Sequence, residues 1–377
     1  MASLCFVAGD PSGDAHAATL FRAILAKQPG ITAAGLGGPA MRAAGITLLD
    51  DLTTTASIGP FDAARHLAHF SRARRLLGAH LRERKPDLAI LVDFGDFNLP
   101  VIAPMMKRAG VPVVYYISPQ VWAWGRWRLA LIRRYVRRML VFFPFEETFY
   151  RQAGIPVTWV GHPLAEAAHP SVSPEEARRR FGLNPSRRTV GLLPGSRGQE
   201  ISRHLPLLIA AAERIAWHMP GIQFLLPRAA SIPRGALEPH LARARCEIRI
   251  AEGPIYDALQ LMEAAIVGSG TATLETALCG VPMVVVYRGS WPTYLAARMV
   301  LRIPHIAMAN IVAGRKVVPE LLQYRASPKR IAEGILALLR HDAWAEDVRR
   351  NLRELKASLG PPGAVARAAD AVLQHLL

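Results

Sequence analysis

Two stretches in the second half of the chain constrain its fold most, because each joins a short apolar run to a glycine-containing turn and then to a helical pattern. The apolar runs are 189–193 and 264–267, and the turns contain Gly195 and residues 268–270. An uninterrupted apolar run of this length between turn signals predicts a strand that is buried on both faces. Such strands alternate with helices in doubly wound α/β domains, so we expect a parallel sheet.

Both turns are suited to a phosphorylated ligand. Free backbone N–H groups at the start of a helix, together with the helix dipole, favour an anion there. In the first turn, Arg197 adds a guanidinium that grips phosphate through paired hydrogen bonds. In the second turn, Glu275 lies one helical turn beyond Thr271, so it faces the same end of the helix and suits sugar hydroxyls. Together the turns indicate a nucleotide sugar with a diphosphate.

The first half opens with an apolar run at 4–8 that leads into the turn AGDPSGD at 8–14. A glycine-containing turn after the first strand is typical of a doubly wound sheet, but the spacing is not GxGxxG, which argues against a dinucleotide cofactor. Asp10, Ser12 and Asp14 bring hydroxyl and carboxylate groups into this turn. They either cap the following helix or bind a ligand, and the sequence leaves both roles open.

Another carboxylate directly follows the apolar run at 88–92. Asp93 stands at the carboxyl end of this predicted strand, where open α/β sheets bind their ligands. A carboxylate in that position suits a general base, so we expect Asp93 to be functional. Asp96 is interpreted as a cap of the next helix, and Asn98 has the same alternative.

The charge balance indicates an acidic partner. The 377 residues include 46 Lys and Arg against 29 Asp and Glu, a net charge of +17. Nucleic acid, an anionic membrane and phosphorylated substrates are all attracted by such a surplus. The segment 58–84 has a basic amphipathic pattern, which fits either a surface helix or contact with anionic lipid. Trp122, Trp124 and Trp127 lie among basic residues, but we favour packing over base stacking and expect no nucleic-acid partner.

Cysteine usage and apolar run lengths limit the cellular setting. Cys5, Cys246 and Cys279 are far apart, and no CxxC or Cys/His cluster occurs, so we expect no metal site and inert thiols in a reducing cytoplasm. The first ten residues lack a basic start and are interpreted as a strand rather than a signal peptide. No run approaches the roughly 20 apolar residues of a spanning helix, so we expect any membrane contact to be peripheral.

The length suits two domains of ordinary size. We predict a Rossmann-like domain at 1–165, a linker at 166–188 and a second Rossmann-like domain at 189–345. The linker prediction rests on a loss of apolar periodicity in a stretch rich in proline, serine and charge. The helices at 346–377 are expected to pack back on the first domain or on a partner subunit.

Nine motifs occur in order along nearly the whole chain: AGDPSGD, VDFGDFN, SPQVWAWGRWR, FPFE, VGHPL, LLPGSRGQEI, SGTATLE, PMVVVYR and PELLQ. In this combination the chain closely resembles the lipid-A-disaccharide synthases. The resemblance implies a GT-B fold, in which two Rossmann-like domains flank a cleft. It also implies an inverting glycosyltransferase. Its expected substrates are UDP-2,3-diacylglucosamine and 2,3-diacylglucosamine 1-phosphate, and its expected products are lipid A disaccharide 1-phosphate and UDP. No DxD-like motif lies at a plausible donor site, so we expect the reaction to need no metal, and we expect no cofactor.

The resemblance also assigns roles to residues. Asp93 matches the family's essential aspartate and would take the proton from the acceptor 6-hydroxyl. Glu275 would lie at the ribose and Asn310 near the nucleotide. The residues expected at the UDP-sugar are Ser196, Arg197, Ser269, Gly270, Thr271, Glu275 and Asn310. Those expected on the acceptor side are Asp10, Ser12 and Asp14.

Two departures from the family pattern concern the acceptor side. The family usually has glutamate where Asp10 stands, and Ala-Pro where Phe94 and Gly95 stand. The resemblance further implies a peripheral location on the anionic, cytoplasmic face of the inner membrane, and a homodimer is a further expectation. The alternatives are another GT-B enzyme acting on a UDP-N-acetylhexosamine, and a non-catalytic relative that binds lipid or nucleic acid. Asp93 argues against the non-catalytic alternative.

Overall fold

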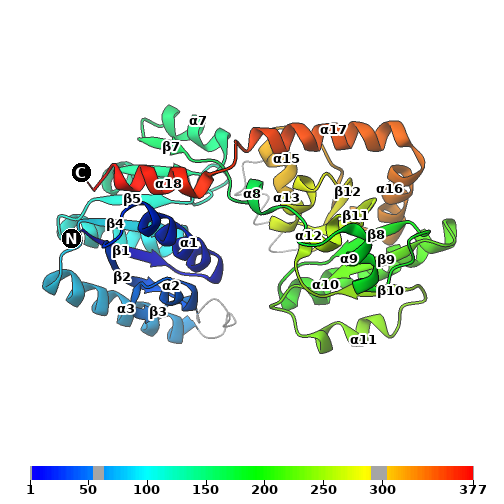
Figure 1. Ribbon diagram of the computed structural model, residues 1–377, viewed down its shortest axis with the longest axis horizontal. Helices are drawn as coiled ribbons and strands as arrows, with labels where there is room; N and C mark the ends of the chain where they lie inside the picture. Colours follow the sequence, from blue (N-terminus) through cyan, green and yellow to red (C-terminus); the bar gives the residue numbers. More distant parts are fainter. Residues whose placement is uncertain (1, 54–62, 290–303, 377) are drawn as a thin grey trace. The chain divides into compact units, whose positions relative to one another are not determined.

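The computed structural model describes residues 2–53, 63–289 and 304–376, and the chain divides into two compact units (Figure 1). The first unit contains Met1–Pro163 and Leu359–Leu377, and the second contains Leu164–Ser358. Each unit is built on one sheet of parallel strands with helices packed against it. The predicted architecture of two doubly wound α/β domains is therefore confirmed.

The first unit has a seven-stranded sheet in the order β3-β2-β1-β4-β5-β6-β7. Its strands are β1 (Ser3–Ala8), β2 (Thr32–Gly37), β3 (Thr47–Asp51), β4 (Leu88–Val92), β5 (Val113–Tyr116), β6 (Arg138–Val141) and β7 (Val157–Trp159). β1 and β4 are neighbours, with Ala8 paired to Val92. The strand order reverses between these two strands, and doubly wound sheets bind ligands beyond such a switch point.

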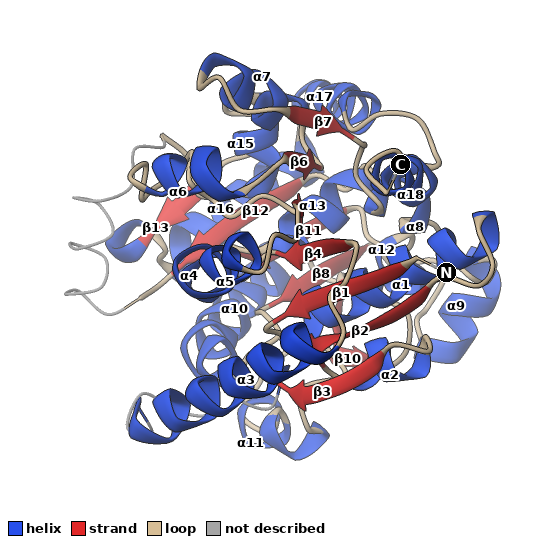
Figure 2. Cartoon of the chain, turned by 90° about the vertical axis from the view of Figure 1, so that its left-hand side faces the viewer, coloured by secondary structure: helices blue, strands red, loops and turns tan. Residues whose placement is uncertain are grey.

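Helices cover both faces of this sheet. They are α1 (Pro11–Lys27), α2 (Pro39–Ala43), α3 (Ala63–Glu83), α4 (Gly95–Phe97), α5 (Ala103–Arg108), α6 (Arg128–Tyr135), α7 (Pro144–Gln152) and α18 (Ala364–Leu373). Figure 2 shows α3 and α5 on one side of the sheet and α1 and α18 on the other. Because side chains alternate along a strand, Tyr115 of β5 joins the core under α3 and α5. Tyr116 packs instead on Phe142, on the opposite face.

The second unit has a six-stranded sheet in the order β10-β9-β8-β11-β12-β13. Its strands are β8 (Thr189–Leu193), β9 (Gln223–Pro227), β10 (Ile248–Ala251), β11 (Ala264–Gly268), β12 (Met283–Tyr287) and β13 (Glu320–Leu322). Its helices are α8 (Leu164–Ala167), α9 (Pro174–Phe181), α10 (Gly198–His218), α11 (Glu238–Leu241), α12 (Ile255–Leu259), α13 (Thr271–Leu278), α15 (Met308–Ala313), α16 (Pro328–Arg340) and α17 (Asp342–Ser358). The apolar runs at 189–193 and 264–267 form β8 and β11. These strands are adjacent, so the turns that follow them lie side by side.

The stretch 166–188, predicted as a linker, lies within the second unit and contains α9. The hydroxyl of Ser173 caps this helix by accepting a hydrogen bond from the N–H of Glu176. Ala177 and Phe181 are buried. The polar composition of the stretch reflects the exposed side of a short amphipathic helix rather than the absence of structure.

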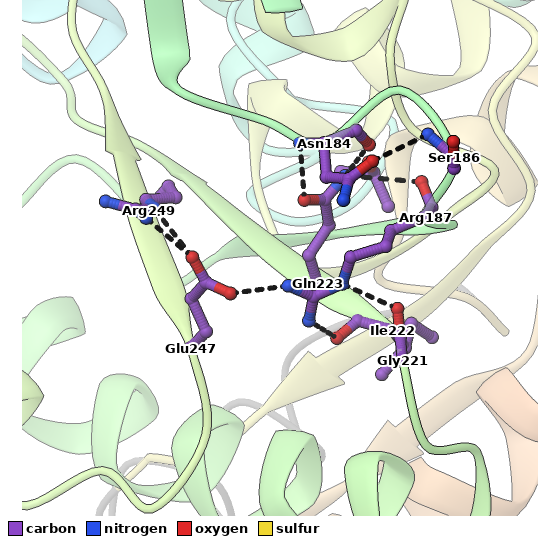
Figure 3. Close-up of polar contacts among 9 residues, drawn as sticks. Asn184, Ser186, Arg187, Gly221, Ile222, Gln223, Glu247 and Arg249 are labelled. Carbon is purple, nitrogen blue, oxygen red and sulfur yellow. Dashed lines mark hydrogen bonds and ion pairs between the residues drawn. The ribbon is translucent and has the colours of Figure 1, made fainter.

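A glutamine then fixes the chain as it enters β8 (Figure 3). The side-chain oxygen of Gln223 accepts a hydrogen bond from the N–H of Asn184 at 3.0 Å, and its nitrogen donates to the carbonyls of Asn184 and Arg187. Arg187 donates to the carbonyl of Gly221 and pairs with Glu247 at 2.6 Å. These bonds give the backbone N–H and carbonyl groups next to β8 and β9 hydrogen-bond partners where the sheet does not supply them.

The predicted C-terminal segment 346–377 is divided between the units. α17 packs on α13, α15 and α16 of the second unit, whereas α18 packs on α1 of the first. The guanidinium of Arg367 on α18 donates to the carbonyls of Val160, Pro361 and Pro362. Within the described ranges, no helix is both long enough and apolar enough to cross a bilayer.

Candidate functional site

The second unit contains a cavity of about 420 Å³ at the carboxyl ends of its central strands. Leu193 of β8, Pro227 of β9 and Gly268 of β11 all line it. Two turns supply six of the residues predicted to bind the UDP-sugar: Ser196, Arg197, Ser269, Gly270, Thr271 and Glu275. Sequence positions about eighty residues apart are therefore brought together at the edge where such sheets bind ligands.

The first turn differs from the expectation that its backbone N–H groups are free. A carboxylate oxygen of Glu200 accepts hydrogen bonds from the N–H groups of Ser196 at 2.8 Å and Arg197 at 3.2 Å. The same side chain covers Gly195, where a Cβ atom would lie 2.3 Å from a Glu200 oxygen. The turn thus contains its own anion. The side chain of Arg197 is 83% exposed, lines the cavity and lies 3.4 Å from Oε1 of Glu200.

The second turn is arranged differently. Gly270 precedes α13 with a φ of 151°, and no side chain in the described part of the chain caps this helix. The hydroxyl of Ser269 donates to the carbonyl of Ile306 at 3.1 Å. The hydroxyl of Thr273 accepts a hydrogen bond from the N–H of Met308 at 3.1 Å. These bonds hold the turn while the start of α13 stays in the cavity wall, where the helix dipole favours an anion.

A buried histidine that the sequence analysis did not identify links the first turn to β12. Nδ1 of His204 lies 2.8 Å from the carbonyl oxygen of Pro194, and Nε2 accepts a hydrogen bond from the N–H of Arg288 at 3.2 Å. One nitrogen therefore donates and the other accepts, which defines the neutral ring with its proton on Nδ1. A Cβ atom at Gly268 would lie 2.8 Å from the Pro194 oxygen, so β11 also passes close to this point.

Glu275 lines the same cavity and accepts a hydrogen bond from the hydroxyl of Tyr256 at 3.3 Å. Burial raises the pKa of Glu275, and the bond from Tyr256 opposes that effect. Arg228 also lines the cavity and pairs with Glu252 at 3.1 Å. Neither Tyr256 nor Arg228 was predicted. Arg228 directly follows β9, which places it at the ligand edge of the sheet.

Asn310 is fully buried and is not among the described residues that line the cavity. Its side-chain oxygen accepts hydrogen bonds from the N–H groups of Val317 and Val318, and its nitrogen donates to Glu320 at 2.7 Å. Glu320 also accepts a hydrogen bond from the N–H of Ala307 at 3.0 Å. The amide of Asn310 therefore organises the segment that approaches the second turn.

In the first unit, Asp93 comes directly after β4 at the switch point of the sheet. Its φ is 43° and that of Phe94 is 50°, a left-handed conformation that residues other than glycine rarely adopt. Burial raises the pKa of Asp93 from 3.8 to about 6, with a further contribution from the charge of Asp10. Such a carboxylate is ionised at neutral pH and still accepts a proton readily.

Asp10 and Ser12 lie in the turn after β1, the neighbour of β4. Asp10 caps α1, because its Oδ1 accepts a hydrogen bond from the N–H of Gly13 at 2.5 Å. Its charge also raises the pKa of Asp93. Ser12 is exposed.

Asp14 has different surroundings from the other two residues predicted on the acceptor side. It is buried, and its oxygens accept hydrogen bonds from the N–H groups of Gly38, Ala40 and Met41 at 2.8–3.0 Å. The carboxylate therefore holds the start of α2 against α1 and is engaged inside the protein.

Asp96 is not a helix cap, which corrects the sequence interpretation. It forms an ion pair with the buried guanidinium of Arg128, which lies 3.9 Å from the ring centroid of Trp124. Trp122 donates to the buried carboxylate of Glu146 at 3.1 Å. Trp122 and Trp124 are therefore packing residues. No group of three or more His, Cys, Asp or Glu side chains within the described ranges is arranged to hold a metal ion.

The comparison of sequences with known proteins covers nearly the whole chain. A sequence model of the family described as lipid-A-disaccharide synthetase matches residues 4–367. The lipid-A-disaccharide synthase of Geobacter sulfurreducens is 44% identical over 373 residues, which cover 99% of this chain and 97% of the relative. That of Anaeromyxobacter dehalogenans (strain 2CP-C) is 44% identical over 371 residues, which cover 98% and 96%.

Solved structures with the same architecture are more distant in sequence. UDP-GlcNAc 2-epimerase from Neisseria meningitidis, bound to UDP-GlcNAc, matches with a TM-score of 0.66 and 13% identity over 99% of this chain and 100% of that one. The calicheamicin glycosyltransferase CalG4 matches with a TM-score of 0.63 and 18% identity over 100% and 98%. At these identities the likeness concerns the fold alone, which is that of GT-B glycosyltransferases and epimerases.

Proposed function

Because the chain belongs to the lipid-A-disaccharide synthase family, we propose that it transfers 2,3-diacylglucosamine from UDP to the 6-hydroxyl of 2,3-diacylglucosamine 1-phosphate. It is a glycosyltransferase of lipid A biosynthesis. The observation that supports the assignment of roles is the environment of Asp93, a carboxylate at the switch point of the first sheet whose pKa is raised to about 6. A carboxylate that is both shielded and ionised at neutral pH is suited to accept a proton.

In the proposed reaction, Asp93 accepts the proton of the acceptor 6-hydroxyl while that oxygen bonds to the anomeric carbon of the donor sugar. The bond from this carbon to the β-phosphate oxygen breaks, and UDP leaves with the electron pair. Attack on the face opposite UDP inverts the configuration and gives the β-1,6 linkage. A base whose pKa lies slightly below the working pH is present mainly in its active form and retains proton affinity.

The donor is proposed to bind in the second unit. The exposed guanidinium of Arg197 and the uncapped start of α13 would hold the diphosphate and stabilise the charge that grows on departing UDP. Glu275, beside Tyr256, would accept hydrogen bonds from the ribose hydroxyls. Asn310 contributes through the segment that it organises. Backbone and arginine donors of this kind supply the stabilisation without a metal ion.

The acceptor is proposed to bind in the first unit, beside Asp93. Asp10 and Ser12 lie in the adjacent turn, with Asp10 near enough to raise the pKa of Asp93. Asp14 would act indirectly, because its carboxylate fixes the junction of α1 and α2. This division leaves Asp10, whose carboxylate also caps α1, and the exposed Ser12 as the polar groups of the turn that would meet the acceptor sugar.

We also propose that the first unit contacts an anionic membrane through α3 and α5. A groove of about 770 Å³ runs between these helices and is lined by Arg74, Arg75, Arg82 and Arg108. Among the described residues, none of these four arginines forms an ion pair with a carboxylate. Unpaired arginines that gather in one groove create a field that attracts lipid phosphates. The four arginines of the groove are part of the net positive charge of the chain, +17.

A homodimer formed by exchange of α18 completes the proposal. In the structure α18 packs on α1 of its own chain, and Lys27 pairs with Asp370 across this contact at 2.6 Å. An exchanged α18 would make the same contacts on a second copy, which is how domain swapping yields a dimer.

The experiment that tests the activity measures UDP release from UDP-2,3-diacylglucosamine with and without 2,3-diacylglucosamine 1-phosphate. The proposal predicts release that depends on the acceptor. Turnover of a simple UDP-N-acetylhexosamine in place of the acylated donor would identify another GT-B enzyme instead. Donor binding without any turnover would identify a non-catalytic relative.

A further inference from the structure

The turn that carries Asp93 is held by two buried side chains. The carbonyl oxygen of Asp93 accepts hydrogen bonds from the hydroxyl of Tyr115 on β5 and from the side-chain nitrogen of Asn98 at 2.9 Å. The N–H of Asp93 donates to the carbonyl of Tyr116 at 3.0 Å. The backbone N–H and carbonyl of Asp93 are therefore both hydrogen-bonded, and the carbonyl accepts from two side chains. Tyr115 and Asn98 are fully buried.

The backbone of this turn needs such support. Asp93 and Phe94 both have left-handed φ values, although neither is glycine. A left-handed conformation at a residue other than glycine persists only where several surrounding interactions stabilise it. Such conformations are frequent at functional sites. The ring of Phe94 adds a further restraint, because it covers Gly9, where a Cβ atom would lie 2.1 Å from the ring.

Core packing alone does not account for these donors. Tyr115 buries a phenol hydroxyl in a largely apolar cluster under α3 and α5, where phenylalanine would fill nearly the same volume. Asn98 begins a π-helical turn, Asn98–Ile102, and such turns are frequent at functional sites. What the two residues share is their acceptor, the carbonyl of Asp93.

We propose that Tyr115 and Asn98 are positioning residues for the base, and this inference rests on the proposed role of Asp93. By fixing the carbonyl of Asp93 they fix the direction of its side chain and keep the carboxylate in its shielded place. The charged groups that face it are Asp10 after β1 and Asp96 on α4. Asp96 is paired with Arg128 of α6, whereas Asp10 accepts a hydrogen bond from Gly13 and forms no ion pair within the described ranges.

The test replaces Tyr115 by Phe and uses Tyr116→Phe as the matched control. Both tyrosines are buried on β5, but they lie on opposite faces of the sheet, and only Tyr115 donates to Asp93. In Tyr115→Phe, kcat should fall about 10- to 100-fold, the loss typical of a misplaced catalytic group, while KM for the donor stays within about two-fold. A freer, better hydrated carboxylate should also shift the acidic limb of the kcat–pH profile to lower pH. Tyr116→Phe should change neither.

Two outcomes would overturn the inference. If Tyr115→Phe matches Tyr116→Phe in kcat and in the position of the acidic limb, while Asp93→Asn is inactive, the positioning role is wrong and the base assignment stands. If Asp93→Asn retains full activity, both are wrong. The position of the limb does not depend on the amount of folded enzyme, so a loss of stability in Tyr115→Phe leaves the test valid. Asn98→Leu, which removes the second donor at similar volume, should shift the limb in the same direction.

Discussion

Asp93 and Glu200 are carboxylates in the turns after two central strands, and their neighbours give them different properties. Asp93 is shielded from water beside Asp10, which raises its pKa, so it is suited to accept a proton. Glu200 accepts hydrogen bonds from two backbone N–H groups and lies beside Arg197, so it is suited to hold a turn. The position of Asp93 made it predictable. The role of Glu200 was not predicted. A glutamate at the third position of a helix gives the same sequence pattern whether or not its side chain bonds to the N–H groups of the preceding turn.

Replacing Asp93 by Asn should stabilise the protein at neutral pH. The folded pKa of about 6 exceeds the ordinary value of 3.8, so the folded state holds the proton more tightly and stability falls as pH rises between these values. Above pH 6 the ionised carboxylate costs on the order of 2–3 kcal/mol, which the neutral amide avoids. Thermal unfolding should therefore give Asp93→Asn the higher Tm at pH 7.5, with a smaller difference at pH 4.5. A difference that is independent of pH would contradict the shielding of Asp93.

Removal of Glu200 should weaken donor binding. Glu200→Ala leaves the N–H groups of Ser196 and Arg197 without their acceptor and frees the Arg197 side chain, so KM for the donor should rise about five-fold, since these charged hydrogen bonds are partly exposed. Glu200→Gln, which retains an acceptor oxygen, should lose less. Glu333→Ala on the exposed side of α16 is the control and should leave KM unchanged. A lower KM in Glu200→Ala would show that this carboxylate competes with the diphosphate.

At the scale of elements, the central strands were predicted most closely. The bounds expected for β4 and β8 agree with the structure, because a short apolar run between turn signals is typical of a strand covered on both faces. The short edge strands β3 and β13 were not predicted, since their half-buried residues lack that signature. The basic helix α6 ends at Tyr135, because Val136 is already extended and β6 begins at Arg138.

The stability of α18 in the first unit should depend far more on Arg367 than on the ion pair between Lys27 and Asp370. Arg367→Ala removes three hydrogen bonds to carbonyls and should cost about 2–3 kcal/mol. Lys27→Ala removes only an exposed pair with Asp370 and should cost less than about 1 kcal/mol. Urea denaturation of the two variants measures the difference. Equal costs would mean that α18 is held by its apolar face alone.

At the scale of the whole molecule, sequence and structure contribute different parts of the account. The two α/β units follow from strand and turn patterns, whereas the GT-B fold was predicted from the resemblance that the ordered motifs carry. The contacts that tune the site were less predictable. Tyr115, Asn98 and His204 act through hydrogen bonds between elements far apart in the chain, and a buried polar residue in a strand or helix pattern does not reveal its partner.

The groove between α3 and α5 leads to a prediction about membrane binding. The protein should cosediment with vesicles that contain anionic phospholipid, and about 0.5 M salt should release it because surface charges are then screened. Arg74→Glu should weaken this binding about ten-fold. Arg179→Glu changes the net charge equally on α9 of the second unit, at an exposed site, and should have little effect. Equal binding to neutral vesicles, or equal loss in the two variants, would contradict the proposed surface.

The most direct test of the account compares the protein with Asp93→Asn in acceptor-dependent UDP release over a range of pH. We predict an acidic limb near pH 6 for the unmodified protein, the pKa of the shielded carboxylate. Asp93→Asn should lose at least about 1,000-fold in rate while its affinity for the donor is retained. A variant that retains its rate, or one that keeps the same acidic limb, would show that another group takes the proton from the acceptor.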